Sequence, residues 1–439
     1  MLLMMAACER DYKVATDASA ISFATDTLSF DTVFANRTTP VASVCIYNNS
    51  DDDIVISRIA LDGGENSQYV VNINGIANYY AQDIHLRSSD SLYIFVSLRP
   101  VKSSDTEAIR IISDGITVNS GNCTSHLDIV AYALSANELR GVLRQDTTLI
   151  AGTTYIISDS LIVAEGVNLK VEEGVNIYME SGASIGVYGT MHVAGTAVDP
   201  VVIRSSRLDE FYDNIPSQWG NIFFHKNSRG NIVDNVRVSG ATNAFIVDSA
   251  ATIDITSTQV SHVGKNGVWA ASAEVNIGNS LIFACGGAAV EVSGGALTIE
   301  QSTLAGYYAW DLRKKASLNI TADEGDIPLD KALIINSIIC GTRANEIEID
   351  STSIQAFHAE NSIFRLDSKW HEDDEYFSNV TITKDLYFVD IEEYDYHLTE
   401  KSPAIDGAKT DVSSKYPLDL DGFDRPAETP DIGAFEYFD

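Results

Sequence analysis

A 22-residue repeat constrains the fold of this chain more than any other feature of its sequence. Four consecutive windows of that length align without a gap, beginning at Asn231, Ile253, Val275 and Leu297. Three columns of the alignment are aliphatic throughout: Val233, Ile255, Ile277, Ile299 at position three, Val238, Val260, Ile282, Leu304 at position eight, and Ile246, Val268, Val290, Leu312 at position sixteen. Because three strand centres recur in each period, we expect a three-sided coil whose turns stack at about 4.8 Å.

Short strands punctuated by glycine extend this coil in both directions. Upstream they occupy residues 161–203, with Gly166, Gly174, Gly182, Gly189 and Gly195 between them. Downstream, residues 334–339 and 360–364 resume the pattern after an insertion. We expect residues 135–400 to form one solenoid, with coils clearest at 231–318, and residues 401–439 to form a terminal cap.

The region before the repeat alternates short β-rich runs with turn-rich gaps. Candidate strands cover residues 41–47, 54–61, 68–73, 91–98, 108–112 and 127–134. This spacing is typical of an immunoglobulin-like β-sandwich over residues 17–134. The sequence therefore predicts an all-β chain, a sandwich followed by a parallel β-helix.

Two segments resemble known families. Gly166 to Gly195, followed by Pro200-Val201-Val202-Ile203 and Trp219-Gly220-Asn221-Ile222, is similar to the opening coils of right-handed single-stranded parallel β-helices of the pectate-lyase-like superfamily. The carboxyl end resembles the choice-of-anchor Q segment, through Ser402 to Asp406, Asp421-Gly422, Arg425 and Asp431 to Tyr437. The resemblance implies the fold and export from a bacterial cell. It implies no single reaction, because the superfamily includes lyases, hydrolases and adhesins.

The charge balance excludes one class of partner. The chain has 62 acidic and 29 basic residues, a formal net charge of −33. A nucleic-acid-binding protein needs a basic surface to displace counterions from phosphate, and a protein that docks on anionic lipid needs one too. We therefore expect neither nucleic acid nor a bare lipid surface as the partner.

The amino terminus offers a different route to a membrane. Met1 to Ala7 is apolar, and Met5-Ala6-Ala7-Cys8 resembles a lipobox, in which small residues precede a lipid-modified cysteine. The segment is shorter than a usual signal peptide and has no basic start. We interpret residues 1–16 as a signal remnant and tether, with Cys8 carrying the lipid.

The other cysteines form no C-x-x-C pair, so they do not indicate zinc. They are Cys45, Cys123, Cys285 and Cys340. An exported protein permits disulfides, and Cys45 and Cys123 lie within one expected domain. The alternative is that all four are small buried hydrophobic residues.

The repeat also predicts a ligand-binding patch. If position sixteen points inward, its neighbours point outward, because side chains alternate along a strand. Phe245, Trp269, Glu291, Asp311 and Arg313 then share one outer face. An aromatic ring beside charged groups is suited to sugars, since the ring covers the apolar face of a pyranose.

Two catalytic interpretations and one structural alternative stay open for this patch. Glu291 and Asp311, placed diagonally at about 7–8 Å, fall near the carboxylate separation of inverting glycosidases. A lyase would instead use calcium to neutralise uronate, with Arg313 or a neighbouring lysine as the base. In the structural alternative, Glu291 and Arg313 are a cross-strand ion pair of little energetic consequence.

Glu346, Glu348 and Asp350 form a separate candidate calcium site. They alternate along one expected strand, so they share a face. A solvated outer face is the alternative. No cofactor beyond this possible calcium is indicated.

Together these patterns predict a lipid-anchored bacterial protein at the cell surface or the periplasmic face of the outer membrane. We expect it to bind glycan, or to act as an adhesin toward glycans or other surface proteins, without catalysis. A lyase or glycosidase acting on acidic polysaccharide is the alternative, and a structural surface spacer is the second.

Overall fold

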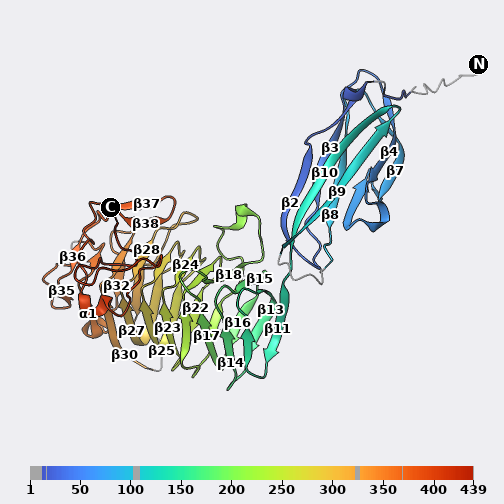
Figure 1. The fold of residues 1–439 in the computed structure, drawn as a ribbon. Coiled ribbons are helices and arrows are strands. Elements are labelled where there is room, and N and C mark those ends of the chain that lie inside the picture. The colour runs from blue at the N-terminus through green and yellow to red at the C-terminus, as the bar shows by residue number, and fades with distance from the viewer. Residues whose placement is uncertain (1–11, 16, 102–108, 322–326, 368, 439) are drawn as a thin grey trace, which may run out of the picture. The chain divides into compact units, whose positions relative to one another are not determined.

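The computed structural model describes residues 12–438, apart from 16, 102–108, 322–326 and 368 (Figure 1). The chain divides into two compact units, Met1–Ala136 and Asn137–Asp439. The predicted fold class is confirmed: a β-sandwich is followed by a parallel β-helix. The described helical segments are short: η1 (Ala18–Ala20), η2 (Gly64–Asn66), η3 (Glu210–Tyr212), η4 (Ile354–Ala356) and α1 (Thr410–Ser413).

The first unit packs two five-stranded sheets face to face. One sheet has the order β1 (Ile21–Phe23), β3 (Ala42–Asn48), β8 (Ser91–Leu98), β5 (Tyr69–Ile73), β6 (Ile76–Ala77). The other has the order β2 (Thr27–Phe34), β10 (Cys123–Leu134), β9 (Ile109–Ser120), β4 (Ile54–Leu61), β7 (Tyr80–Leu86). Side chains alternate along the strands, and the inward ones fill the space between the sheets. Fully buried examples are Ile46, Ile56, Ile94 and Val118.

The second unit is a coil with three sides, named A, B and C here in chain order. Side A contains β15 (Asn176–Met179), β18 (Val201–Ser205), β21 (Val236–Ser239), β24 (Gln259–Ser261), β26 (Leu281–Phe283), β28 (Thr303–Gly306), β31 (Ile338–Gly341), β34 (Ile363–Phe364) and β36 (Thr381–Ile382). Side B contains β16 (Ser184–Val187), β19 (Ile222–Phe224), β22 (Phe245–Val247), β29 (Leu318–Thr321) and β32 (Ile347–Ile349). Side C contains β12 (Thr147–Leu149), β14 (Asn168–Val171), β17 (Thr190–Ala194), β20 (Asn231–Asp234), β23 (Thr252–Thr256), β30 (Leu329–Ile335), β33 (Phe357–Glu360) and β35 (Phe377–Ser378).

Four longer strands bend round a corner and serve two sides. β11 (Asn137–Leu143) and β13 (Thr154–Val163) join sides A and B, and β25 (Val268–Gly278) and β27 (Val290–Glu300) join sides B and C. Each strand pairs in parallel with its counterpart in the next coil, which gives the stack of short arrows in Figure 1. The inward residues form one continuous aliphatic core along the axis.

Two of the three repeat columns are confirmed by the strand register. Val233, Ile255, Ile277 and Ile299 pair in sequence on side C, and Val238, Val260, Ile282 and Leu304 on side A. The sixteenth column is wrong at both ends. Val268 pairs with Phe245 rather than Ile246, and Val290 pairs with Leu318 rather than Leu312. The corner between sides A and B varies in length, so the spacing of 22 fails there.

The terminal segment covers the outer face of side A over the later coils. There the outward residues of side A become apolar: Leu281, Phe283, Ala305, Ile338 and Ile363. They pack against Leu386, Tyr396, Leu398, Ile432 and Phe435 of the terminal segment, which also forms the hairpin of β37 (Phe388–Asp390) and β38 (Asp395–Leu398). The outer face of side A is therefore open only over the earlier coils.

Candidate functional site

A row of outward side chains crosses side B, one from each successive coil. Its members pair in register: Phe223, Ile246, Trp269, Glu291, Asn319 and Glu348. The neighbours of Trp269 on its strand, Val268 and Ala270, are fully buried, whereas Trp269 itself is 37% exposed. The predicted adjacency of Trp269 and Glu291 is thus present, at one coil spacing of about 4.8 Å.

Two further aromatic rings widen the row at its amino-terminal end. The rings of Tyr188 and His225 are stacked, with centroids 3.7 Å apart and an interplanar angle of 9°. The ring of His225 also lies 4.0 Å from that of Phe223. Burial lowers the pKa of His225, against the opposing effect of Asp248, and so favours the neutral ring. Tyr188, His225, Phe223, Ile246 and Trp269 form the surface that we call the aromatic strip.

The strip ends at the carboxylate of Glu291, both oxygens of which bind donors of the protein. Lys315 Nζ lies 2.6 Å from each oxygen of Glu291, Asn266 Nδ2 donates to Oε2 at 2.7 Å, and Asn319 Nδ2 donates to Oε1 at 3.3 Å. Glu291 is only 7% exposed. Both oxygens of Glu291 are therefore engaged by donors of the protein itself.

Asp311 and Arg313 do not lie where the repeat placed them. They belong to a loop over residues 307–317, inserted before β29, so Asn319 rather than either of them follows Glu291 in the row. Leu312, expected to point inward, is 87% exposed. The diagonal carboxylate separation inferred for Glu291 and Asp311 therefore has no basis in the register.

Arg313 points inward instead of outward. Its side chain is 2% exposed, and Nη2 lies 2.5 Å from Oε2 of Glu346, which is fully buried. Nη2 also donates to the carbonyl of Lys315 at 3.0 Å. The pair fixes the base of the 307–317 loop, and a guanidinium so enclosed is not open to a substrate.

The position predicted for Phe245 is also wrong. Phe245 is the neighbour of the outward residue Ile246 on the same strand, so its ring points into the core. It is 0% exposed there, and its ring centroid lies 6.4 Å from that of Phe224. It cannot contact a ligand on the outer face. Phe223, which continues the alternation after Ile222, occupies the exposed position instead.

The candidate calcium ligands are occupied by protein groups. Glu346 accepts from the backbone N–H of Ser317 at 2.9 Å and of Arg343 at 2.7 Å, besides its pair with Arg313. Glu348 pairs with Arg343 at 2.7 Å. Hydrogen bonds from Thr352 lower the pKa of Asp350. Over the described part of the chain, no three His, Cys, Asp or Glu side chains lie so as to hold a metal ion.

Cys8 lies outside the described residues, so the lipid site predicted there is not seen. Cys45, Cys123, Cys285 and Cys340 are free thiols, and all four are buried. Burial raises the pKa of Cys285 to about 12, as expected of an unreactive core thiol. Among the described helices, none is long and apolar enough to cross a bilayer.

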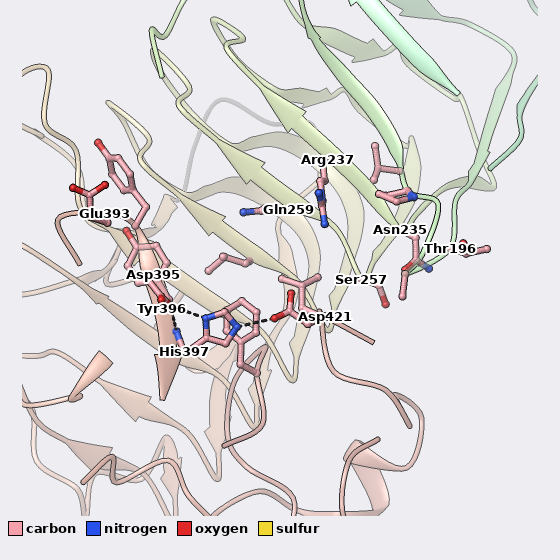
Figure 2. Close-up of a pocket in the computed structure, with 17 residues that line it drawn as sticks. Thr196, Asn235, Arg237, Ser257, Gln259, Glu393, Asp395, Tyr396, His397 and Asp421 are labelled. Carbon is pink, nitrogen blue, oxygen red and sulfur yellow. Dashed lines mark hydrogen bonds and ion pairs between the residues drawn. The ribbon is translucent and has the colours of Figure 1, made fainter. Parts of the chain in front are cut away.

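A cleft of about 270 Å³ opens at the edge of the terminal segment (Figure 2). Arg237 and Gln259 line it from side A, and His397 faces it from β38. The ring of His397 donates from Nδ1 to Asp395 at 2.6 Å and from Nε2 to Asp421 at 2.7 Å. The hydrogen bond to Asp421 is the largest of the effects that raise the pKa of His397 to about 9.

At this cleft the side chain of His397 joins two parts of the chain. The raised pKa of His397 favours the imidazolium at neutral pH, in which both ring nitrogens are donors. Asp395 and Asp421 are both held by that one cation. The arrangement ties β38 to the loop that contains Asp421.

Sequence reasoning missed Tyr188, Phe223 and His225. The alternation of side chains could have indicated them. Ile185 and Val187 point inward, so Tyr188 follows on the outside. Ile222 and Phe224 point inward, so Phe223 and His225 point outward. A long insertion containing η3 separates the two strands in sequence, so their neighbouring positions did not show as a repeat.

No family model matches the chain, and no curated protein matches it. Several solved structures are similar at low TM-scores, among them the following three. The PapD-like domain 7 (ASH) of human CEP192 has a TM-score of 0.20 at 11% identity, over 29% of this chain and 95% of that one. A family 123 glycoside hydrolase from Clostridium perfringens, described for glycolipid glycan hydrolysis, has a TM-score of 0.19 at 6% identity, over 26% of each chain.

The third covers most of the chain. The catalytic unit of a thermostable GH87 alpha-1,3-glucanase from Streptomyces thermodiastaticus strain HF3-3 has a TM-score of 0.29 at 10% identity. The match spans 73% of this chain and 78% of the glucanase chain. At these TM-scores none of the three similarities carries an argument about function, which is taken from the chain's own geometry.

Proposed function

We propose that the aromatic strip on side B binds a carbohydrate chain without cleaving it. The observation that carries this proposal is the alignment of Phe223, Ile246 and Trp269 in register on three successive coils, followed directly by Glu291 and Asn319. The apolar faces of sugar rings pack on aromatic rings, and their hydroxyl groups bond with carboxylates and amides. A strip that crosses several coils favours an extended chain over a single sugar.

Binding is favoured over cleavage by the state of the polar groups. A glycosidase needs two carboxyl groups across the scissile bond, one of them protonated. In the row, Glu291 accepts hydrogen bonds on both oxygens, and Glu348 is paired with Arg343. A lyase needs a base and a cation for the uronate, and Arg313 is buried against Glu346.

A neutral glycan fits better than an acidic one. The net charge of −33 repels a polyanion before it reaches the surface. Lys315, at the Glu291 end of the strip, is engaged with Glu291. We therefore infer that the ligand is recognised by stacking and hydroxyl contacts, which disfavours the alternative of an enzyme that acts on acidic polysaccharide.

The test is a glycan array probed with the wild-type chain and with Trp269→Ala. We expect the variant to lose about tenfold in affinity for every bound neutral glycan, because a buried aromatic contact is worth more than about 1 kcal/mol. Phe211→Ala is the matched control, since Phe211 is 75% exposed and lies outside the strip. Equal binding by wild type and Trp269→Ala would remove the strip as the site.

Two separate assays test whether the chain cleaves glycans. Incubation with the bound glycans should release no new reducing ends, and incubation with pectate or alginate plus calcium should produce no ultraviolet absorbance from unsaturated uronate. Activity in either assay would replace binding with catalysis.

We also propose that the chain is exported and held at a bacterial membrane by lipid on Cys8. The support is the sequence from Met5 to Cys8, in which small residues precede the cysteine. In a bacterial host, wild type should fractionate with membranes and Cys8→Ser with the soluble proteins. Membrane fractionation of Cys8→Ser would contradict the anchor.

A further inference from the structure

One sheet of the sandwich carries no charge at all. Strands β1, β3, β8, β5 and β6 contain no Asp, Glu, Lys, Arg or His along their whole lengths. Charged residues make up 21% of the chain, so this sheet departs sharply from the rest of the molecule. The opposite sheet of the same unit has charged or titratable side chains on every strand, among them Asp31, Arg58, Asp83, Arg110 and Asp128.

The outer face of the uncharged sheet is also aromatic. Tyr47 is 41% exposed, Tyr93 is 56% exposed and Phe95 is 47% exposed. The rings of Tyr93 and Phe95 are nearly parallel, at an interplanar angle of 20° with centroids 6.4 Å apart. Val70 adds exposed aliphatic area. A soluble protein seldom exposes so many large apolar groups together without a partner.

Small polar side chains are interleaved with these rings. Phe95 is paired with Ser43 on one neighbouring strand and with Asn72 on the other. Ser97, two residues along the same strand, pairs with Val70. The face therefore offers ring surfaces, hydroxyl groups and an amide, and no ion.

We infer that this face is a second glycan-binding surface, specific for neutral polysaccharide. A charged partner of either sign would lose its hydration here and gain no opposite charge in return. The mixture of flat rings with hydroxyl and amide groups matches a sugar, whose apolar faces and hydroxyl groups both need contacts. The surface is named the sandwich platform: Ser43, Tyr47, Val70, Asn72, Tyr93, Phe95 and Ser97.

A second copy of the chain is the competing occupant, and the charge disfavours it. Residues 1–136 contain 16 acidic and 8 basic side chains, so two sandwiches brought together through this face repel each other. The inference does not depend on the aromatic strip of side B, since the two surfaces share no residue and lie in separate compact units. If both bind one polysaccharide, the second contact becomes intramolecular and strengthens attachment.

The experiment measures retention of the full chain on insoluble neutral polysaccharides, namely cellulose, chitin and mannan, and on alginate as an acidic comparison. The test variant is Tyr93→Ala/Phe95→Ala, and the conservative variant Tyr93→Phe keeps the ring. Tyr132→Ala is the matched control, because Tyr132 is 39% exposed on the opposite, charged sheet. Thermal melting checks that each variant folds, and Trp269→Ala reports on the other surface.

We expect the double variant to lose about tenfold in affinity for at least one neutral polysaccharide, with Tyr93→Phe and Tyr132→Ala unchanged. Combining it with Trp269→Ala should lower retention further than either alone. Unchanged retention of the folded double variant overturns the inference, even if Trp269→Ala abolishes binding. A wild-type dimer that the double variant converts to monomer, with glycan retention unaltered, overturns it in favour of self-association. No retention of wild type on any neutral polysaccharide also overturns it.

Discussion

Single residues at one corner of the coil set the stacking of its turns. Where side C meets side A, seven successive coils place a residue at positive φ, between 45° and 54°: Asn235, Ser257, Asn279, Gln301, Asn336, Asn361 and Asn379. Asparagine tolerates this left-handed conformation better than most residues. The next residue forms a second ladder, in which the backbone N–H of Ser280 donates to the hydroxyl of Ser302, and Ser302 to Ser337. The residues at positive φ, most of which have amide side chains and which we call the amide column, are therefore accompanied by a buried hydroxyl column.

At this corner the side chain of Asn336 makes hydrogen bonds both to the neighbouring coil and to the terminal segment. Its Nδ2 donates to Gln301 Oε1 at 3.0 Å and to the carbonyl of Lys409 at 2.9 Å, and its Oδ1 accepts from the N–H of Lys409 at 2.7 Å. We expect Asn336→Ala to lower the free energy of unfolding by about 3 kcal/mol, from left-handed strain and unsatisfied buried groups together.

Denaturant titration measures that loss, and Asn336→Gly is the control. Glycine accepts positive φ without strain, so it should cost less than alanine although it removes the same hydrogen bonds. A glycine variant as unstable as the alanine variant would show that strain at this corner is negligible.

At the scale of elements, the carboxyl-terminal motif acts as a clamp on the coil. Arg425 pairs with Glu436, both 2% exposed, and its Nη2 donates to Asn279 at 2.8 Å. The N–H of Gly433 donates to the carbonyl of Asn336 at 2.9 Å, and Gln301 Nε2 donates to the carbonyl of Gly433 at 3.0 Å. The motif that resembles the choice-of-anchor Q segment thus has a structural use here: it attaches the terminal segment to the amide column.

Removing the cation of this clamp should be severe. Arg425→Met leaves Glu436 buried without its partner, which typically costs about 3–5 kcal/mol. Burial already raises the pKa of Glu436 to about 7, and loss of Arg425 should raise it further. Denaturant titration at pH 5 and pH 8 checks both points, since the variant should lose more stability at pH 8. An equal loss at the two pH values would contradict the assignment.

The His397 bridge predicts a second pH dependence, of the same sign but at higher pH. The pKa of His397 is raised from 6.5 to about 9 in the folded chain. Its contribution to docking of the terminal segment is therefore complete below pH 6.5 and is lost as the pH rises through about 9. Hydrogen exchange in β38 should increase between pH 7 and pH 10 relative to His397→Gln, after correction for intrinsic exchange. A wild-type profile parallel to that of the variant would contradict this.

At the scale of the whole molecule, the two compact units have separate hydrophobic cores. A unit with its own core should unfold by itself. We expect fragments Met1–Ala136 and Asn137–Asp439 to fold when expressed separately, each with the transition temperature that it has in the full chain. Calorimetry of the three proteins is the measurement. A fragment that shows no cooperative transition would mean that its fold requires the other unit.

The fold could be predicted well from the sequence, and the site only in part. The columns of Val233 and Val238 identified the coil, because burial that alternates along a strand is a local pattern. Trp269 and Glu291 were placed correctly, since both belong to coils of equal length. The predicted positions of Asp311, Arg313 and Phe245 were wrong. A fixed spacing of 22 residues no longer aligns the strands where the corner between them contains additional residues.

What the sequence alone determined is the class of each unit, since periodic burial and turn chemistry are properties of neighbouring residues. The tertiary structure decided which side chains share a surface. Tyr188 and His225 meet only because two distant strands pair across an insertion. The uncharged sheet becomes visible only when β1, β3, β8, β5 and β6 are known to lie together, although they are not consecutive in the chain. Both facts depend on strand pairing between remote segments, which hydrogen bonding and core packing settle and local composition does not.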